Sequence, residues 1–405
     1  MTHHRSTWGS DPSASYDALA ERFRPVFQRI RKGAVAREID RTLPYEQIRW
    51  LKEAGFGAIR VPREQGGAGA TLPEVFALLA ELAEADSNVT QALRAHFAYA
   101  EDVLNSADPE RRARWFKRFV RGDLVGSAWT EIGPAKMAAF STIVTRQDDR
   151  LLLNGAKFYT TGSIFADWID VGAVDGEGET VSVIAAVGAT GVGILDDWDG
   201  FGQKLTGSGT ATFTNVPIAP EHVVPGDERF GYSAAFVQVV HLATLVGIAR
   251  AAAQDAASAV SQRTRTYSHA AASRSGDDPQ VLQVIGHLHG LAYAAGSIVA
   301  KTAEALQRSF EARHVAEDAE IANVAAEIEV AQAQPVVSAL TLEATAVLFD
   351  ALGASATSRA KSLDRYWRNA RTISSHNPRI YKDRIVGDYV VNGTRPPFQW
   401  RIGQA

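Results

Sequence analysis

The chain contains no cysteine among its 405 residues. Disulfide bonds, thiolate nucleophiles and cysteine-ligated metal sites are therefore excluded, because each of them needs a thiol. The charge is also nearly balanced, since 42 lysine and arginine residues oppose 46 aspartate and glutamate residues for a net charge of −4. So small a negative charge gives no electrostatic basis for binding nucleic acid or a membrane surface, and we expect neither as a partner.

Several motifs that mark common cofactors are missing too. No G-x-G-x-x-G follows an expected strand, so the fingerprint of a nicotinamide-binding fold is absent. We also find no P-loop, no H-E-x-x-H metal motif and no G-x-S-x-G nucleophile elbow. No apolar run reaches about 18 residues without a charge, and residues 1–15 lack the apolar core of a secretory signal. The sequence therefore predicts a cytoplasmic protein without a membrane span.

The pattern of apolar residues divides the chain into three parts. Residues 15–120 repeat apolar positions at helical spacing. From about residue 121 the pattern changes to six short β-rich stretches, which is typical of a small antiparallel barrel or sandwich. From about residue 230 the chain is alanine-rich, with long helical stretches that favour a four-helix bundle. We predict an α+β protein with these parts: an N-terminal helical domain (1–120), a central small β-barrel (121–228) and a C-terminal helical bundle (229–405).

A histidine stands at the end of a predicted helix in the stretch RNARTISSHNPRIYK (368–382). Asn377 precedes Pro378, and a residue before proline is pushed out of the helical region, so the helix should stop close to His376. A side chain at a helix end can project into a cleft. Taken alone, the segment is better explained by a capping or surface histidine.

Four further stretches give the chain a family resemblance. VPREQGGAGATLPEVFALLAELAEAD is similar to the turn-and-helix segment of the acyl-CoA dehydrogenases, GSAWTE to their first flavin-contacting strand, LNGAKFYTTGSIFADWIDVGA to the second, and GSGTATFTNVPI to the barrel-closing strand. These stretches occur in the family's order, and the resemblance spans about residues 15–390. It implies the acyl-CoA dehydrogenase fold: helical domain, small β-barrel and four-helix bundle.

The chain departs from the dehydrogenases at the catalytic base. These enzymes need a carboxylate to take the α-proton of a thioester, and in the common type the position of that glutamate falls here on Asn377. A second type carries its glutamate on the first bundle helix, which reads FVQVVHLATLVGIA here and has no acid. An amide has no useful basicity near neutral pH, so either route lacks its agent.

The stretch WRNARTISSHNPRIYK instead resembles the flavin-dependent monooxygenase branch of the same fold. That branch includes dibenzothiophene monooxygenase, the amino-sugar nitrososynthases and the oxidoreductases of sulfur acquisition. LPYEQIRWLKEAGFGAIRVP, DWDGFGQKLTGSG and GASATS are most similar to the last group. The resemblance implies an enzyme that takes reduced flavin from a separate flavin reductase. With O2 this flavin forms a C4a-hydroperoxide, which oxygenates a small organosulfur compound.

The resemblance also assigns residues. His376 and His96 are the expected active-site histidines, with His376 as a proton donor whose pKa lies near neutrality. Thr161 matches the hydroxyl residue beside flavin N5, and Ser127 falls where dibenzothiophene monooxygenase has an asparagine. Further flavin contacts are expected at Ala128, Trp129, Thr130, Gly162 and Trp198. The phosphate-binding positions fall on or near Arg265, His269, Gly353 and Ser355.

Some alternatives stay open at this point. FMN is the expected cofactor, with FAD as the alternative, and a homotetramer is expected by resemblance. The residues do not separate sulfur from nitrogen oxygenation. An acyl-CoA dehydrogenase with a displaced base and a non-catalytic scaffold of the same fold also remain as hypotheses.

Overall fold

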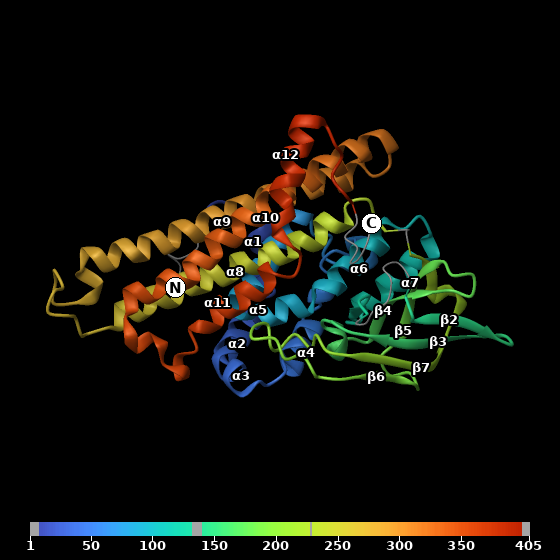
Figure 1. Cartoon of the computed structure of the whole chain (residues 1–405), viewed down its shortest axis with the longest axis horizontal. Coiled ribbons are helices and arrows are strands. Elements are labelled where there is room, and N and C mark those ends of the chain that lie inside the picture. Colours follow the sequence, from blue (N-terminus) through green and yellow to red (C-terminus); the bar gives the residue numbers. More distant parts are fainter. Residues whose placement is uncertain (1–7, 132–139, 227–228, 399–405) are drawn as a thin grey trace.

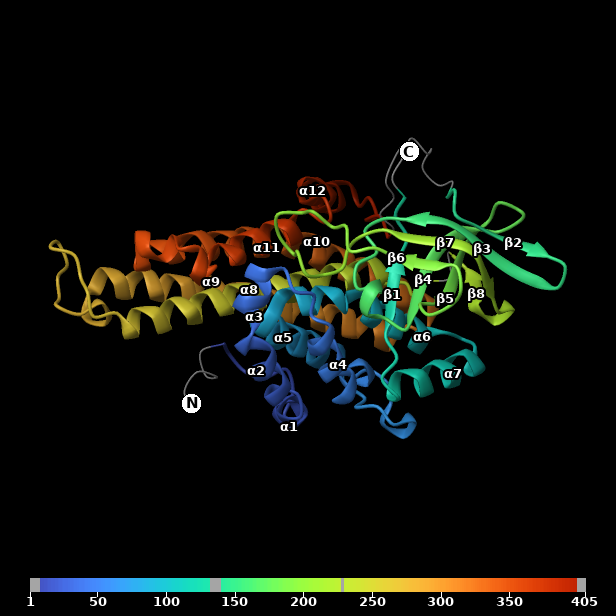
Figure 2. The same cartoon turned by 90° about the horizontal axis from the view of Figure 1, so that it is seen from below.

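The computed structural model describes residues 8–131, 140–226 and 229–398. Its three parts follow the order of the sequence, as Figure 1 shows. Helices from the N-terminal region pack beside a set of long helices, and a β-sheet lies at one end of those long helices. Figure 2 shows the same arrangement from below, with α1 to α4 along one side.

The N-terminal part is helical, as predicted. Its longest helix, α5, begins with a capping box in which Thr71 and Glu74 bond each other's backbone N–H groups, and it bends where Asp86 adopts an extended conformation. The helices are α1 (Tyr16–Glu21), α2 (Arg24–Lys32), α3 (Ala34–Asp40), α4 (Tyr45–Glu53), α5 (Leu72–Ala92), α6 (Arg94–Asn105) and α7 (Pro109–Val120).

The central part is one mixed sheet with the hydrogen-bonded order β6-β7-β3-β2-β4-β5-β8, and β1 pairs with β4 off this path. The expected purely antiparallel pairing is wrong at β4, because β1 and β2 both run parallel to it. Strand spacing along a sequence cannot reveal such a crossover. The strands are β1 (Val125–Ala128), β2 (Ile143–Gln147), β3 (Arg150–Lys157), β4 (Trp168–Val174), β5 (Thr180–Ala186), β6 (Val192–Ile194), β7 (Ala211–Ile218) and β8 (Val223–Pro225).

The C-terminal part confirms the three long helices. Alanine-rich faces let them approach closely, and α8 lies in the core with almost every side chain between Ala235 and Ala253 buried. The helices are α8 (Ser233–Gln262), α9 (Pro279–Ala312), α10 (Ala316–Leu352), α11 (Asp364–Ser374) and α12 (Lys382–Asn392).

Two of these helices, α8 and α10, are long and apolar enough to cross a membrane by length and composition alone. One or two such helices are weak evidence for a membrane span, because a mostly buried core helix passes the same test. In α8, 83% of the apolar stretch is buried inside the fold, and in α10 the share is 44%. The apolar character of α8 is thus explained by its place in the protein core.

Candidate functional site

His376 follows the end of α11 and meets a second histidine. Its ring centroid lies 4.3 Å from that of His241 in α8, with the rings inclined by 41°. The turn is fixed by Asn377, whose side chain donates to Gln238 Oε1 at 2.8 Å and whose carbonyl accepts from Gln334 Nε2 at 2.9 Å. Helices α8 and α10 therefore both hold the segment that presents His376.

Asn377 also sets the state of the His376 ring. His376 Nδ1 lies 3.1 Å from Asn377 Oδ1. Because the Asn377 amide nitrogen already donates to Gln238, its oxygen faces the ring, so Nδ1 carries the hydrogen. Nε2 of the neutral ring is then left free to accept a hydrogen bond. His376 keeps accessible surface that a ligand can reach, although the protein atoms crowded around its ring still remove part of its solvation.

The charge of Arg94, the first residue of α6, acts on both rings. Its Nε is buried without a partner, and no hydrogen bond or ion pair to its side chain is present in the described part of the chain. Burial lowers the pKa of Arg94 to about 10, so it stays charged at pH 7. Burial and the Arg94 charge lower the pKa of His376 to about 4, against the opposing hydrogen bond of Asn377.

Both imidazoles of the cluster are consequently neutral at pH 7. The pKa of His241 also falls well below its usual value, through burial first and then through His376 and Arg94. The pKa of His376 therefore lies below the near-neutral value that the sequence analysis expected, because burial first and then the Arg94 charge disfavour the protonated ring. The sequence analysis missed both Arg94 and His241. A lone histidine in the apolar stretch FVQVVHLATLVGIA was the available signal.

His96 is not brought to this cluster. Its Nε2 lies 2.8 Å from the carbonyl oxygen of Gly57, and its Nδ1 accepts from the Val125 N–H at 3.3 Å. The edges of Phe97 and Phe119 enclose the ring, which is 1% exposed. Both nitrogens are thus occupied by backbone groups, and the contacts are those of a structural histidine that ties α6 to β1.

Thr161 lies in a chain of hydroxyl groups. Its Oγ1 is 2.7 Å from Ser208 Oγ, which is 2.7 Å from Thr206 Oγ1, and Thr206 donates to the carbonyl of Gln203 at 3.0 Å. The neighbouring Gly162 N–H donates to the Thr206 carbonyl at 2.9 Å. This loop is therefore held rigidly, with a hydroxyl group at the position expected for the flavin N5 contact.

Gly162 also connects this loop to the cluster. A Cβ at this position would lie 1.9 Å from the carbonyl oxygen of Ala92, so the loop backbone touches the last residue of α5. Arg94 follows two residues later at the start of α6. The loop of Thr161 and Gly162 therefore packs against the backbone of Ala92, two residues before Arg94.

The β1 residues are fixed mainly through their backbone. The carbonyl of half-buried Ser127 accepts from Ser163 Oγ at 3.2 Å, and Ala128 is fully buried opposite Val171. The carbonyl of Thr130 accepts from the Phe158 N–H at 2.8 Å. These bonds hold the predicted edge of the flavin site in place.

The Trp129 side chain, in contrast, packs into the barrel. Its ring faces Phe140 and Gly172 and lies under the Arg229 guanidinium, and its Nε1 is buried without a partner. A flavin contact at Trp129 would therefore use its backbone.

Trp198 lies beside the Thr161 loop. Its Nε1 donates to the Gln203 carbonyl at 3.1 Å, and its ring centroid is 5.9 Å from that of Tyr159. Gln203 in turn donates through its backbone N–H to Asn369 Oδ1 of α11 at 2.6 Å. The structure therefore joins Trp198, the Thr161 loop and α11, the helix that ends next to His376.

Glu131 clamps the end of the GSAWTE segment. Its two carboxylate oxygens accept from the side chains and N–H groups of Ser141 and Thr142 and from Lys157 Nζ at 2.7 Å. Burial alone would raise the pKa of Glu131, but these bonds outweigh it and lower the pKa to about 2. Burial lowers the pKa of its partner Lys157 to about 8.

Replacing Glu131 by glutamine should destabilise the protein by about 3 kcal/mol at pH 7, because it leaves the buried Lys157 without its counter-charge. The stabilisation by Glu131 is fully present above its unfolded pKa of about 4.5 and is lost as the pH falls toward about 2. Urea unfolding from pH 7 to 3 would measure this, with exposed Glu177→Gln as the control. Equal unfolding free energies for Glu131→Gln and the control would contradict the role of the clamp.

The predicted phosphate residues gather elsewhere. Arg263 donates to the Leu352 carbonyl at 2.9 Å, so the loop that carries Arg265 and His269 meets the turn of Gly353 and Ser355. His241 and Gln262 are 21 positions apart in α8, which corresponds to about 32 Å of helix. Figure 1 shows this loop at the end of the long helices opposite the sheet. Within one chain, these four residues do not meet His376.

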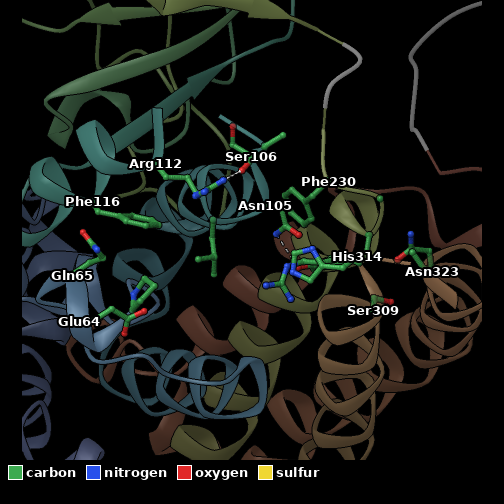
Figure 3. Close-up of a pocket in the computed structure, with 17 residues that line it drawn as sticks. Glu64, Gln65, Asn105, Ser106, Arg112, Phe116, Phe230, Ser309, His314 and Asn323 are labelled. Atoms are coloured by element: carbon green, nitrogen blue, oxygen red, sulfur yellow. Dashed lines mark hydrogen bonds between the residues drawn. The ribbon is translucent and has the colours of Figure 1, made fainter. Parts of the chain in front are cut away.

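A large pocket of about 660 Å³ contains none of the predicted residues. It lies between the α6–α7 turn, the start of α8 and the α9–α10 turn. Figure 3 shows this pocket, with Asn105, Phe230 and His314 among the residues that line it. Its base is the buried network in which Glu101 accepts from Arg60 and Tyr232. Cavity size alone therefore does not identify the functional site.

The arrangement around Thr161 and Arg94 suits a flavin ring. It offers a hydroxyl group and the backbone groups of a clamped strand, and none of the carboxylates in the described part of the chain acts on His376. Residues Ser127 to Thr130, Thr161 and Gly162 could hold the ring.

Comparison with known proteins supports this interpretation. Residues 14–123 match the family described as "Acyl-CoA dehydrogenase, N-terminal domain", and residues 239–378 match "Acyl-CoA dehydrogenase, C-terminal domain". The chain is 26% identical to the "Probable FMNH2-dependent monooxygenase SfnC" of Pseudomonas putida, over 85% of this chain and 88% of the relative.

Two solved structures are similar over nearly their whole length. TdsC of Paenibacillus sp. A11-2, solved with FMN and indole, has a TM-score of 0.85 and 28% identity, over 96% of this chain and 99% of that chain. The methanesulfinate monooxygenase MsuC of Pseudomonas fluorescens has a TM-score of 0.83 and 25% identity, over 94% of this chain and 98% of that chain. Both confirm the predicted fold.

Proposed function

Because the chain belongs to the acyl-CoA dehydrogenase family, in its flavin-dependent monooxygenase branch, we propose that it is the oxygenase component of a two-component system. FMN is its cofactor. A separate reductase supplies the flavin in reduced form, and O2 and reduced FMN provide oxygen for transfer through the C4a-hydroperoxide. The substrate is a small organosulfur compound.

The observation that carries this proposal is the replacement of the dehydrogenase base. Asn377 occupies the position of the common glutamate, and α8, the helix that carries the glutamate of the second type, has no acid in FVQVVHLATLVGIA and presents His241 to His376. The charged group acting on His376 is Arg94, and none of the described carboxylates acts on it. The Asn377 amide and the Arg94 cation cannot accept an α-proton at pH 7, and a pKa of about 4 leaves the neutral His376 ring only a weak base.

The remaining parts of the proposal concern the assembly. We place Arg265, His269, Gly353 and Ser355 at the flavin phosphate of a second copy, because one chain keeps them about 32 Å of helix from His241. A homotetramer in the cytoplasm would provide such a copy. Loss of FMN affinity on replacing Arg265, without change in the sedimentation of the oligomer, would support this placement.

The decisive experiment is anaerobic titration with reduced FMN and reduced FAD, followed by an oxygen pulse with a panel of organosulfur and amine substrates. We expect tighter binding of reduced FMN, weak binding of the oxidised form and an oxygenated sulfur product. Hydrogen peroxide as the sole product across the panel would contradict the proposal. An oxygenated amine would instead identify a nitrogen oxygenase, and bleaching of bound FAD by an acyl-CoA would identify a dehydrogenase.

A further inference from the structure

We propose that Gln238 of α8 is a positioning residue, which acts through Asn377 to decide whether His376 offers the reacting oxygen a hydrogen-bond acceptor or a donor. This inference rests on the proposed function and adds a residue to the same site. It begins with three side chains in a line, His376, Asn377 and Gln238, which the end of α11 and the second turn of α8 bring into contact.

Two buried glutamines from different helices hold Asn377. Gln238, which is 4% exposed, accepts from Asn377 Nδ2 at 2.8 Å. Gln334 of α10, which is 2% exposed, donates through Nε2 to the Asn377 carbonyl at 2.9 Å, and its own Oε1 is buried and meets no partner among the described residues. A buried polar atom without a partner costs free energy, so these amides are best explained by what they do to the turn at His376.

The line of three side chains has two self-consistent directions of hydrogen bonding. An amide carries an acceptor and a donor of nearly the same shape, and a neutral imidazole carries one N–H and one acceptor nitrogen. If residue 238 accepts, Asn377 turns its oxygen to the ring, so Nδ1 carries the hydrogen and Nε2 accepts. If residue 238 donates, Asn377 turns its amide nitrogen to the ring, so Nδ1 accepts and Nε2 carries the hydrogen.

The structure has the first of these directions. Asn377 Oδ1 lies 3.1 Å from His376 Nδ1, and the Asn377 amide nitrogen points to Gln238 Oε1. The backbone of the turn is held separately, because the Asn377 carbonyl accepts from Gln334 and the His376 N–H donates to the Ile373 carbonyl at 3.0 Å. The Asn377 side chain could therefore turn over without moving the backbone, and the acceptor of Gln238 is what opposes this.

The direction decides what the ring does for the reacting oxygen. With Nε2 as acceptor, the ring takes a hydrogen bond from a protonated oxygen and keeps that proton in place. With Nε2–H as donor, the ring instead stabilises an oxygen that has lost its proton and bears negative charge, which favours release of hydrogen peroxide. Gln238 thus biases the enzyme toward oxygenated product.

Four variants separate the acceptor of Gln238 from its bulk. Gln238→Glu keeps the size and leaves an ionised group that only accepts, so Asn377 keeps its orientation. Gln238→Met keeps the length and removes the hydrogen bond, so the Asn377 amide is free to turn. Gln334→Met removes the other buried amide bond to Asn377 but cannot reverse its side chain. Exposed Gln262→Met, also in α8, is the control.

The first readout is the position of the proton on His376 in the ligand-free protein. NMR of enzyme labelled with 15N-histidine, at pH 8, reports which ring nitrogen carries hydrogen, and His376→Ala assigns its signals among the ten histidines. We expect an Nδ1–H signal in wild type, Gln238→Glu and Gln334→Met, and a shift toward Nε2–H in Gln238→Met. This readout needs neither flavin nor turnover, so it stands even if the proposed function fails.

The second readout is the release of hydrogen peroxide after an oxygen pulse to the reduced-FMN complex, without substrate. Gln238→Met should release peroxide about five- to tenfold faster than wild type, the ratio expected for the loss of one neutral hydrogen bond. Gln238→Glu and the Gln262→Met control should stay within about twofold of wild type, because both keep an acceptor at position 238.

Three results would overturn the inference. An Nε2–H signal in the wild type would mean that the line runs in the other direction. The same NMR shift in Gln334→Met as in Gln238→Met would show that both amides only support the turn. Peroxide release from Gln238→Glu as fast as from Gln238→Met would show that an acceptor at position 238 does not matter.

Discussion

His376→Ala should divert most of the consumed oxygen to hydrogen peroxide and lower the rate of substrate oxygenation about 10²- to 10⁴-fold, the usual range for a lost acid–base group. Binding of reduced FMN should change little, because the side chain is exposed and, among the residues that the structure describes, its side chain hydrogen-bonds to Asn377 alone. The measurement is the ratio of oxygenated product to peroxide per NADH consumed.

The expected effect follows from the state of the ring. With its pKa lowered to about 4, His376 is neutral at pH 7 and holds its hydrogen on Nδ1 toward Asn377. Nε2 can therefore accept a hydrogen bond and keep a proton in place near the reacting oxygen, where loss of that proton would lead to peroxide. In this state His376 therefore accepts a hydrogen bond through Nε2. The sequence analysis had instead suggested a protonated ring that donates a proton.

Two variants make the His376 result specific. His376→Gln keeps a polar group at the position and should retain part of the coupling. His287→Ala removes a half-exposed histidine of α9 that pairs with Glu343, and it should behave as wild type. Normal product yield from His376→Ala would refute the proton role, and lost flavin binding would show that the substitution acts through the fold.

The sequence predicted the parts of this site that depend on local order. The long helices and the helix end before His376 are both set by short-range patterns, and the structure has them. The contact between His241 and His376 joins positions 135 residues apart in different helices. Helical periodicity shows which face of α8 is apolar, but it cannot show which helix end will meet that face.

His96 illustrates the same limit at short range. Arg94 and His96 are two residues apart on α6, so at about 100° per residue their side chains point to different sides. Only one of them can face the cluster. The resemblance favoured His96 because it matches a second active-site histidine of dibenzothiophene monooxygenase. The structure instead turns His96 to Gly57 and Val125, and the charge that acts on His376 is that of Arg94.

Gly162→Ala should abolish or strongly weaken reduced FMN binding while most of the fold survives. Gly162 has φ +80°, a conformation that costs a residue with a side chain about 1–2 kcal/mol. The new methyl group would also lie 1.9 Å from the Ala92 carbonyl oxygen, so the loop with Thr161 must move away from α5. Anaerobic titration should show a loss of at least tenfold in affinity for reduced FMN.

The matched control for this variant is Gly178→Ala. Gly178 has φ +90° in the turn between β4 and β5, and a Cβ there would meet no atom within 4 Å. It therefore carries the same backbone strain without the collision, and urea unfolding should report a similar strain cost for both variants plus an excess for Gly162→Ala. If Gly162→Ala binds reduced FMN as tightly as Gly178→Ala does, the loop can shift without consequence. The flavin would then have to lie away from Thr161, and the contact between this loop and the end of α5 could not link the flavin to the Arg94 cluster.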